Sequence, residues 1–304
     1  MSVSVVIPTF RRPDGVLRAL LSVFAQTRLP EEIVVVDNDP AASARQTIAD
    51  LQASAPCPLR YVHEARPGVS NARNAGFAAA SGRFIAFLDD DETADPAWLD
   101  ALLETAASQD ASVVFGPLRG EALDADGIRG DLALRLYSRY GPDADASLEK
   151  PYGCGNSLID RAAFDLPDHP FDPRMNVSGG EDDVFFLMLA GQGARFAWSV
   201  KAHGVEWVDP KRTSWRYLMA RSFAFGQGAT QTARHAGQPA RIAFWMGVGL
   251  GQALVFGPLA ALAALVAPGK AAALLDKAIQ GTGKLFWIEA FEPRFYGQSV
   301  AAPS

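Results

Sequence analysis

The stretch FIAFLDDDE, residues 84–92, is an apolar segment that ends abruptly in four acidic residues. An apolar run of this kind between helical patterns predicts a strand buried on both faces, with the acidic residues at its carboxyl end. Carboxylate oxygens held together there suit Mg²⁺ or Mn²⁺ carrying a bound phosphate. A solvated acidic turn that caps the next helix is the alternative. The neighbouring sequence decides in favour of the cation site.

Two more segments predict buried strands of the same sheet. SVSVVIPTF (2–10) is an almost continuous β-branched run, and EEIVVVDND (31–39) is another that closes on polar residues. Residues 13–26 and 71–80 have helical patterns and lie between the strands. This alternation predicts an α/β fold, Rossmann-like, with a mostly parallel central sheet and helices on both faces.

Polar residues follow three of the predicted strands. Thr9, Asp37 and Asp89–Asp91 each stand where an apolar run ends. In open α/β sheets, ligands bind beyond the carboxyl ends of the strands. We therefore expect these side chains to converge on one crevice.

Composition narrows the class of protein. The chain has 304 residues, a net charge of −6 and a pI near 5.3. A general nucleic-acid binder needs a basic surface, so this class is excluded. Cys57 and Cys154 have no His or Cys neighbours at metal-binding spacing, which favours structural thiols over a disulfide or a zinc site. Strand one follows the N-terminus without a basic and apolar leader, so we expect no signal peptide.

The C-terminal part changes character. Residues 242–267 carry no charge and are long enough to cross a bilayer core. Pro258 predicts a kink or a split into two shorter helices, so that a re-entrant or interface-lying hairpin competes with a simple span. Lys270, Lys277 and Lys284 recur every seven residues and predict one basic helix face toward anionic lipid. The alternative is a buried helix of a soluble homodimer.

Six motifs in order resemble the family 2 glycosyltransferases, which have the GT-A fold. They are VVIPTFRR, VVVDND, RPGVSNARNAGFAAASGRFIAFLDDDE, DPAWLDALL, GNSLIDRAAF and GGEDDVFFLML, which together span roughly residues 3–225. The resemblance implies a GT-A domain over 1–225, with a nucleotide-binding half at about 1–115 and an acceptor half at about 116–225. Residues 226–304 are then a C-terminal membrane-associating helical region, apolar and amphipathic.

By the same resemblance, one group of residues binds the nucleotide sugar. Asp37 is expected to accept a hydrogen bond from the imide N–H of uracil or a close pyrimidine, which favours a UDP-linked donor, although thymidine has the same imide. Arg73 fixes a phosphate or the aspartates, or else it forms a salt bridge at the edge of the core. The full set is Pro8, Thr9, Phe10, Arg12, Asp37, Asn38, Arg66, Arg73, Asp89 and Asp90.

The expected cofactor is Mg²⁺ or Mn²⁺. The resemblance makes Asp91 the direct ligand and places Asp89 beside it, facing the ribose or sugar, although Glu92 leaves the register open by one. His203 is a third candidate ligand, and a polar loop residue is the alternative. Related sequences often have His where this chain has Glu206.

The acidic cluster Glu181, Asp182 and Asp183 precedes an apolar helix, where acidic residues usually act as caps. Within the resemblance, Asp182 is instead the catalytic base and Glu181 its partner on the acceptor side. Gly155 and Asn156 join Glu181 in acceptor binding, because glycine permits close backbone approach and Asn156 can bond a sugar hydroxyl. Ordinary turn residues are the alternative reading.

Together these features predict a metal-dependent inverting glycosyltransferase at the cytoplasmic face of the inner (plasma) membrane. It uses a nucleotide-sugar donor, extends a lipid-linked or polysaccharide acceptor for the cell envelope or exopolysaccharide, and forms a homodimer or joins a synthase complex. A sugar nucleotidyltransferase is one alternative, but its Gly-rich basic loop is replaced here by IPTFRRPDG. A non-catalytic subunit that binds nucleotide sugar or lipid is the other.

Overall fold

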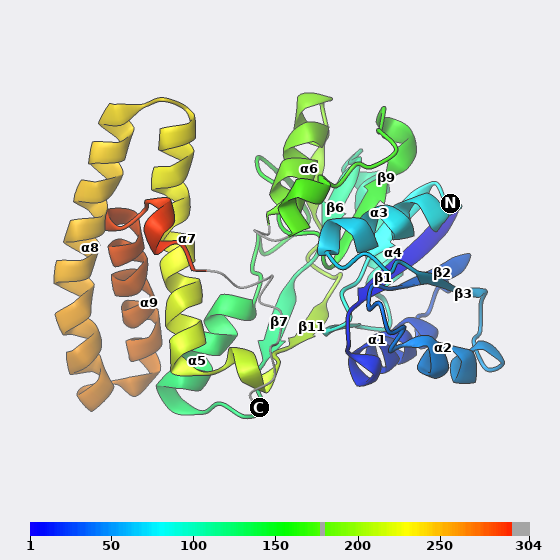
Figure 1. Ribbon diagram of the computed structural model, residues 1–304, viewed down its shortest axis with the longest axis horizontal. Coiled ribbons are helices and arrows are strands. Elements are labelled where there is room, and N and C mark those ends of the chain that lie inside the picture. Colours follow the sequence, from blue (N-terminus) through cyan, green and yellow to red (C-terminus); the bar gives the residue numbers. More distant parts are fainter. Residues whose placement is uncertain (177–179, 294–304) are drawn as a thin grey trace. The chain divides into compact units, whose positions relative to one another are not determined.

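The computed structural model describes residues 1–176 and 180–293, which form two compact units (Figure 1). Unit 1 contains Met1–Arg119 and Arg139–Glu206. Unit 2 contains Gly120–Ser138 and the described residues from Trp207 onward. The boundary between the units thus follows Glu206, which is earlier than the predicted boundary at 225. The internal segment Gly120–Ser138 belongs to the same unit as the C-terminal helices.

The core of unit 1 is an eight-stranded sheet in the order β3-β2-β1-β4-β9-β6-β10-β8. Strands β1, β2, β3 and β4 are mutually parallel, β9 is antiparallel to both β4 and β6, β10 is parallel to β6, and β8 is antiparallel to β10. The sheet is therefore mostly parallel, as predicted. The bounds are β1 Val3–Thr9, β2 Glu32–Asp37, β3 Leu59–His63, β4 Phe84–Phe87, β6 Val113–Phe115, β8 Ala146–Leu148, β9 Ser157–Asp160 and β10 Phe196–Trp198.

Helices cover both faces of this sheet, which confirms the predicted α/β fold. Alternate residues of a strand point to opposite faces, so Val5 joins one core cluster and Val6 the other. Helices α1 (Pro13–Phe24), α2 (Arg45–Gln52) and α4 (Trp98–Ser108) supply the first cluster. Helices α3 (Val69–Ala79) and α6 (Glu181–Gly191) supply the second.

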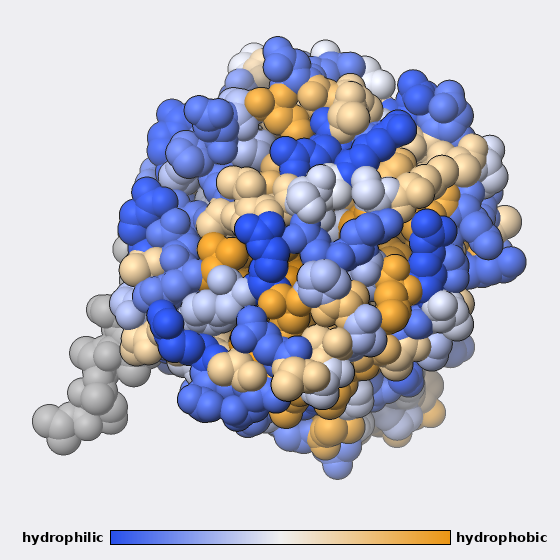
Figure 2. Space-filling view, turned by 90° about the vertical axis from the view of Figure 1, so that its right-hand side faces the viewer, coloured by the Kyte–Doolittle hydropathy of each residue, from blue (hydrophilic) through white to orange (hydrophobic). Residues whose placement is uncertain are grey.

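A three-stranded sheet begins at Glu92, the last residue of the acidic stretch. Its order is β5 (Glu92–Ala94), β11 (Gly204–Trp207) and β7 (Leu118–Glu121), with β5 and β11 antiparallel. Two short 3₁₀ helices, η1 (Arg161–Ala163) and η2 (Pro173–Asn176), connect elements of unit 1. The side of unit 1 that carries β2 and β3 is mainly hydrophilic, with scattered hydrophobic areas (Figure 2).

Unit 2 is built from helices. They are α5 (Gly127–Tyr137), η3 (Pro210–Arg212), α7 (Trp215–His235), α8 (Pro239–Val266), α9 (Pro268–Leu285) and η4 (Glu289–Phe291). Pro258 lies inside α8 and does not split it, contrary to one of the two outcomes predicted. By length and composition, α8 is the one helix in the described residues that can cross a membrane.

Helix α9 packs against both α7 and α8 through glycine contacts (Figure 1). A Cβ on Gly249 of α8 would lie 2.6 Å from the Gly281 carbonyl oxygen, and a Cβ on Gly283 would collide with the Phe223 carbonyl of α7. This close approach buries Lys284, which is only 8% exposed, while Lys270 and Lys277 stay exposed. The prediction that the three lysines form one exposed face is therefore wrong at Lys284.

Candidate active site

The ends of β1 and β4 meet, because the two strands are parallel neighbours. Thr9 Oγ1 donates a hydrogen bond of 2.8 Å to Asp90 Oδ2, and the Phe10 amide donates to the same oxygen at 3.3 Å. Thr9 and Asp90 are buried, Pro8 is half-buried and the Phe10 ring is exposed. Asp90 therefore ties the two strand ends together, and Phe10 is the side chain here that is open to a ligand.

Arg12 binds the acidic stretch directly. One guanidinium nitrogen, Nη1, lies 2.9 Å from Asp90 Oδ1 and 2.7 Å from Asp91 Oδ2. Burial, together with the charge of Asp91, raises the pKa of Asp90 to about 6 although Arg12 opposes the shift. Burial works against the charge of Arg12 as well, yet the two aspartates outweigh it and raise its pKa. Arg12 thus neutralises part of this acidic group.

Arg73 of α3 brings the two acidic stretches to one place. Its Nη1 donates to Glu181 Oε1, and its Nη2 lies 3.4 Å from Asp89 Oδ1. The side chains of Arg73 and Glu181 are 6% and 8% exposed, while that of Asp89 is 31% exposed. Burial raises the pKa of Glu181 even though Arg73 lowers it. Arg73 thus forms a buried salt bridge with Glu181 and also contacts Asp89, so the two alternatives for Arg73 occur together, and a role toward a phosphate stays a prediction.

Residues 153–156 form a loop that packs against these carboxylates. A Cβ on Gly155 would collide with Glu92 Oε1 and lie 2.9 Å from Asp89 Oδ2, and one on Gly153 would lie 3.0 Å from Asp182 Oδ2. The predicted close backbone approach at Gly155 is therefore present, but it is made to acidic side chains of the protein. Only glycine leaves room for them at this position.

Both polar atoms of the Asn156 side chain are hydrogen-bonded within the protein. Its Nδ2 donates to the Pro117 carbonyl at 2.8 Å and to the Ala202 carbonyl at 2.9 Å, and its Oδ1 accepts from Trp98 Nε1 at 2.8 Å. The side chain has no exposed surface. The prediction that Asn156 bonds a sugar hydroxyl is therefore wrong for this conformation, because no face of the amide is accessible.

The side chains of Asp37 and Asn38 are also hydrogen-bonded within the protein. The Asp37 carboxylate accepts from the Asp39 and Ala44 amides and from the Tyr61 hydroxyl, and it is fully buried. Asn38 Nδ2 donates to two carbonyls, those of Glu64 and Arg66, and its Oδ1 accepts from the Gly68 amide, all between 2.7 and 2.9 Å. Direct contact between the Asp37 carboxylate and a nucleobase does not agree with this burial. Both residues instead hold the loops after β2 and β3.

Two further predicted residues lie at the surface. The Arg66 side chain is 72% exposed and pairs with Glu64 at 2.8 Å. His203 is exposed, and its carbonyl accepts from the Asp95 amide at 3.0 Å. Strand β11 places Glu206, not His203, opposite Glu92. His203 is thus about 10 Å farther along the strand, at roughly 3.3 Å per residue, which speaks against its assignment as a metal ligand.

The acidic residues that remain suit a divalent cation. Asp89 and Asp91 offer carboxylate oxygens, and Mg²⁺ is typically held by one or two carboxylates together with substrate phosphates. Burial and the charge of Asp91 raise the pKa of Asp89 against the effect of Arg73, so an added cation would relieve this cost. Within the described ranges, no three acidic, His or Cys side chains already form a cage. Asp89 and Asp91 are thus the residues that would hold such a cation together with its phosphates.

Sequence reasoning missed Arg139, which holds the loop of residues 153–156. Its Nη1 donates to the Gly155 carbonyl at 2.7 Å and its Nη2 to the Gly153 carbonyl at 3.2 Å. Nothing in the pattern around Arg139 indicated this, because its partners are backbone atoms far along the chain. Asp182, half-buried, accepts from the Asp183 amide at 3.0 Å and faces Gly153.

Residues 4–166 match the profile of the family described as Glycosyl transferase family 2. The chain therefore belongs to the family 2 glycosyltransferases, as its motifs predicted. The match includes the first five motifs, while GGEDDVFFLML lies beyond it. Succinoglycan biosynthesis protein ExoM of Rhizobium meliloti (strain 1021) is 35% identical over 227 residues, which are 72% of this chain and 71% of ExoM.

Two other relatives are matched over less of their length. Succinoglycan biosynthesis protein ExoO of the same organism is 36% identical over 205 residues, 64% of this chain and 57% of ExoO. An uncharacterized glycosyltransferase, alr2836 of Nostoc sp. (strain PCC 7120 / SAG 25.82 / UTEX 2576), is 38% identical over 148 residues, 49% of this chain and 44% of that protein.

The fold also matches a solved structure. S. aureus TarS 1-349 in complex with UDP has a TM-score of 0.53 and 16% sequence identity, over 100% of this chain and 98% of that one. At this identity the likeness concerns the fold.

Proposed function

We propose that this glycosyltransferase moves a sugar from a UDP-sugar to a glycan acceptor with inversion at the anomeric carbon. The observation that carries the proposal is Arg73, which joins Asp89 of the acidic stretch to Glu181 at the start of α6. A donor phosphate group near Asp89 and an acceptor near α6 would then be held close together. Such proximity is what a displacement between two bound substrates requires.

In the proposed reaction, an acceptor hydroxyl oxygen attacks the anomeric carbon from the face opposite the diphosphate. The bond from that carbon to the diphosphate oxygen breaks, and Asp182 takes the proton of the hydroxyl. Glu181, held by Arg73, fixes the start of α6 and so positions Asp182. A Mg²⁺ or Mn²⁺ ion, held by Asp91 and Asp89, would neutralise charge on the departing diphosphate.

The donor assignment rests on the fold and on the exposed side chain at the end of β1. The TarS fragment of similar fold was solved with UDP, which supports a uridine nucleotide as donor carrier. Phe10 is 42% exposed at the strand end, and the Arg11 guanidinium lies over its ring, 4.9 Å from the centroid, so a base would stack on the ring face that Arg11 leaves free. Because Asp37 is buried, we assign recognition of the base to groups other than its carboxylate.

For the acceptor, we propose a growing exopolysaccharide on a lipid carrier. Succinoglycan biosynthesis is the role in the names of both ExoM and ExoO, and succinoglycan is an exopolysaccharide. A lipid carrier requires the enzyme to work at a membrane. Unit 2 offers a surface for this.

The outer face of α8 is the surface that we assign to the membrane. Its exposed large side chains recur at helical spacing: Phe244, Leu250, Leu254, Val255, Leu259, Leu262 and Leu265. Arg241 and Lys270 flank the uncharged run and are exposed, and they would attract anionic lipid. Helix α9, packed along α8, carries the buried Asp276, which pairs with Arg135 of α5 at 2.6 Å, and this ion pair would be costly at bilayer depth. We therefore propose that α8 lies in the interface, at the cytoplasmic face, and does not span.

The test is transfer from a panel of nucleotide sugars with and without Mn²⁺, using lipid-linked acceptors. We expect a uridine donor to be preferred and Asp182→Asn to transfer sugar about a hundredfold more slowly, while it binds UDP normally. Asp183→Asn is the matched control, since it makes the same change one residue away. An equal loss of transfer rate in both variants would contradict the assignment of Asp182 as the base. Consumption of the donor without transfer of its sugar to the acceptor would contradict the proposed reaction.

A further inference from the structure

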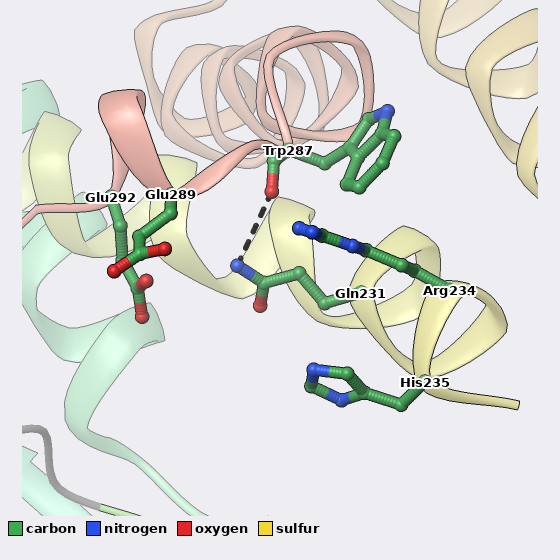
Figure 3. A pocket seen from close by; sticks show the side chains of 6 residues that line it. All are labelled: Gln231, Arg234, His235, Trp287, Glu289 and Glu292. Carbon is green, nitrogen blue, oxygen red and sulfur yellow. Dashed lines mark hydrogen bonds between the residues drawn. The ribbon is translucent and has the colours of Figure 1, made fainter.

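A small pocket lies at the end of α7 in unit 2 (Figure 3). It has a volume of about 200 Å³ and is lined by Gln231, Arg234, His235, Trp287, Glu289 and Glu292. Pockets for drug-sized ligands measure about 300–1,000 Å³. This pocket therefore suits a small polar group.

Side chains of α7 hold the opposite wall in place. Gln227 Nε2 donates to the Phe286 carbonyl at 2.8 Å, and Gln231 Nε2 donates to the Trp287 carbonyl at 3.4 Å. The Arg234 guanidinium lies over the Trp287 ring, 5.5 Å from its centroid. The wall is thus fixed by polar contacts from α7, so the pocket is formed before any ligand arrives.

The pocket carries charges of both signs on different sides. In Figure 3, Arg234 and His235 lie on one side of Gln231, and Glu289 and Glu292 lie on the other. Among the ion pairs within the described residues, none joins the basic side to the acidic side. Opposite charges that share a small pocket without pairing leave room for a group that carries both charges itself.

The surroundings of the pocket are apolar. Phe286, Ile288 and Phe291 are 49%, 43% and 51% exposed, and they alternate along the chain with pocket residues. His235 is followed after a short turn by Pro239, the first residue of α8. Charged groups framed by exposed apolar side chains are typical of a surface that meets lipid headgroups.

We propose that this pocket binds the phosphoethanolamine headgroup of phosphatidylethanolamine. Arg234 and His235 would donate to the phosphate, and Glu289 and Glu292 would accept from the primary ammonium. Choline fits less well, because a quaternary ammonium has no N–H to donate and the face of Trp287 is already covered by Arg234. The inference rests on the proposed membrane docking of α8 and adds a lipid preference to it.

Vesicle co-sedimentation of the full chain tests the preference. We expect vesicles of phosphatidylcholine with phosphatidylethanolamine to bind the protein roughly tenfold more tightly than phosphatidylcholine alone, about the effect of one added charge-assisted contact. Glu289→Gln/Glu292→Gln should abolish this difference. Asp126→Asn/Asp131→Asn, which removes two exposed carboxylates of the same unit, is the matched control and should keep it. Circular dichroism checks that both variants are folded.

The other possible results distinguish the headgroup site from the membrane docking of α8. Equal binding to both kinds of vesicle, or an unchanged preference in the glutamate variant, would overturn the headgroup site while leaving docking intact. If no vesicle bound the protein, docking by α8 would be wrong, and calorimetric titration with glycerophosphoethanolamine would decide the pocket alone. Binding that is lost in Glu289→Gln/Glu292→Gln supports the site, and absence of binding to the wild-type protein overturns it.

Discussion

Replacing Arg73 with Gln should destabilise unit 1 strongly. The change removes the positive partner of Glu181 and of Asp89. Breaking a buried ion pair by removing one partner costs about 3–5 kcal/mol, because the other charge stays buried. Glu181 is only 8% exposed and carries most of this cost, whereas Asp89 is 31% exposed and keeps part of its hydration. We therefore expect a loss near the lower end, about 3 kcal/mol at pH 7.

The loss of stability in Arg73→Gln should become smaller as the pH falls. The pKa of Glu181 is already raised in the folded protein, and without Arg73 it must rise further. A carboxyl whose folded pKa exceeds its unfolded value favours folding at low pH, and this contribution is lost as the pH rises through the folded pKa. The deficit of Arg73→Gln should thus be smaller at pH 5 than at pH 7.

Hydrogen exchange at the amides of β1 and β4 measures the stability of unit 1 by itself. Arg73→Gln/Glu181→Gln removes both charges and should recover at least half of the loss. Arg66→Gln is the matched control, since its pair with Glu64 is exposed and should matter by less than about 0.5 kcal/mol. A loss below about 1 kcal/mol for Arg73→Gln, or a double variant no more stable than the single, would refute the reasoning.

Three further outcomes are expected. Arg12→Gln should raise the affinity for Mn²⁺ in calorimetry roughly tenfold, since it removes the guanidinium that competes with the ion for Asp91, whereas unchanged affinity would show that Arg12 does not compete. Asp37→Asn should lower the melting temperature but leave the affinity of the folded enzyme for UDP within about threefold, and selective loss of UDP binding would restore its role in base recognition. Leu254→Gln/Leu262→Gln should weaken vesicle binding, while Leu123→Gln/Leu134→Gln, at two other exposed leucines of the same unit, should not; equal effects would mean that α8 is not the docking face.

The sheet could be predicted from the sequence because its strands are buried on both faces. An almost continuous apolar run such as Val3–Ile7, interrupted only by Ser4, admits few other structures, and parallel strands bring their polar ends to one edge. The meeting of Thr9 with Asp90 followed from this rule. The alternation between two cores could also be predicted, since it depends only on the period of a strand.

What could not be predicted is which polar groups are already used by the protein. Asn156 and Asp37 stand at expected positions, yet their polar atoms are already bonded within the protein. Asn156 bonds groups far along the chain, and Asp37 accepts from two nearby amides and from the Tyr61 hydroxyl. Lys284 illustrates the same limit, because its heptad spacing cannot reveal that Gly249 of α8 lets the helices approach closely enough to bury it. Each error concerns a partner that only the folded chain supplies.

The path of the chain has a consequence for how this enzyme can be divided or recombined. Within the described residues the backbone passes between the units three times, after Arg119, after Ser138 and after Glu206. Leu132 and Leu136 of α5 pack in a cluster with Leu218 and Ala272. A gene fusion or truncation at Glu206 would therefore leave α5 in the protein without the helices that cover its apolar face. The C-terminal helices therefore cannot be removed or replaced by themselves. A chimera of two homologues must take α5 and the C-terminal helices from the same parent.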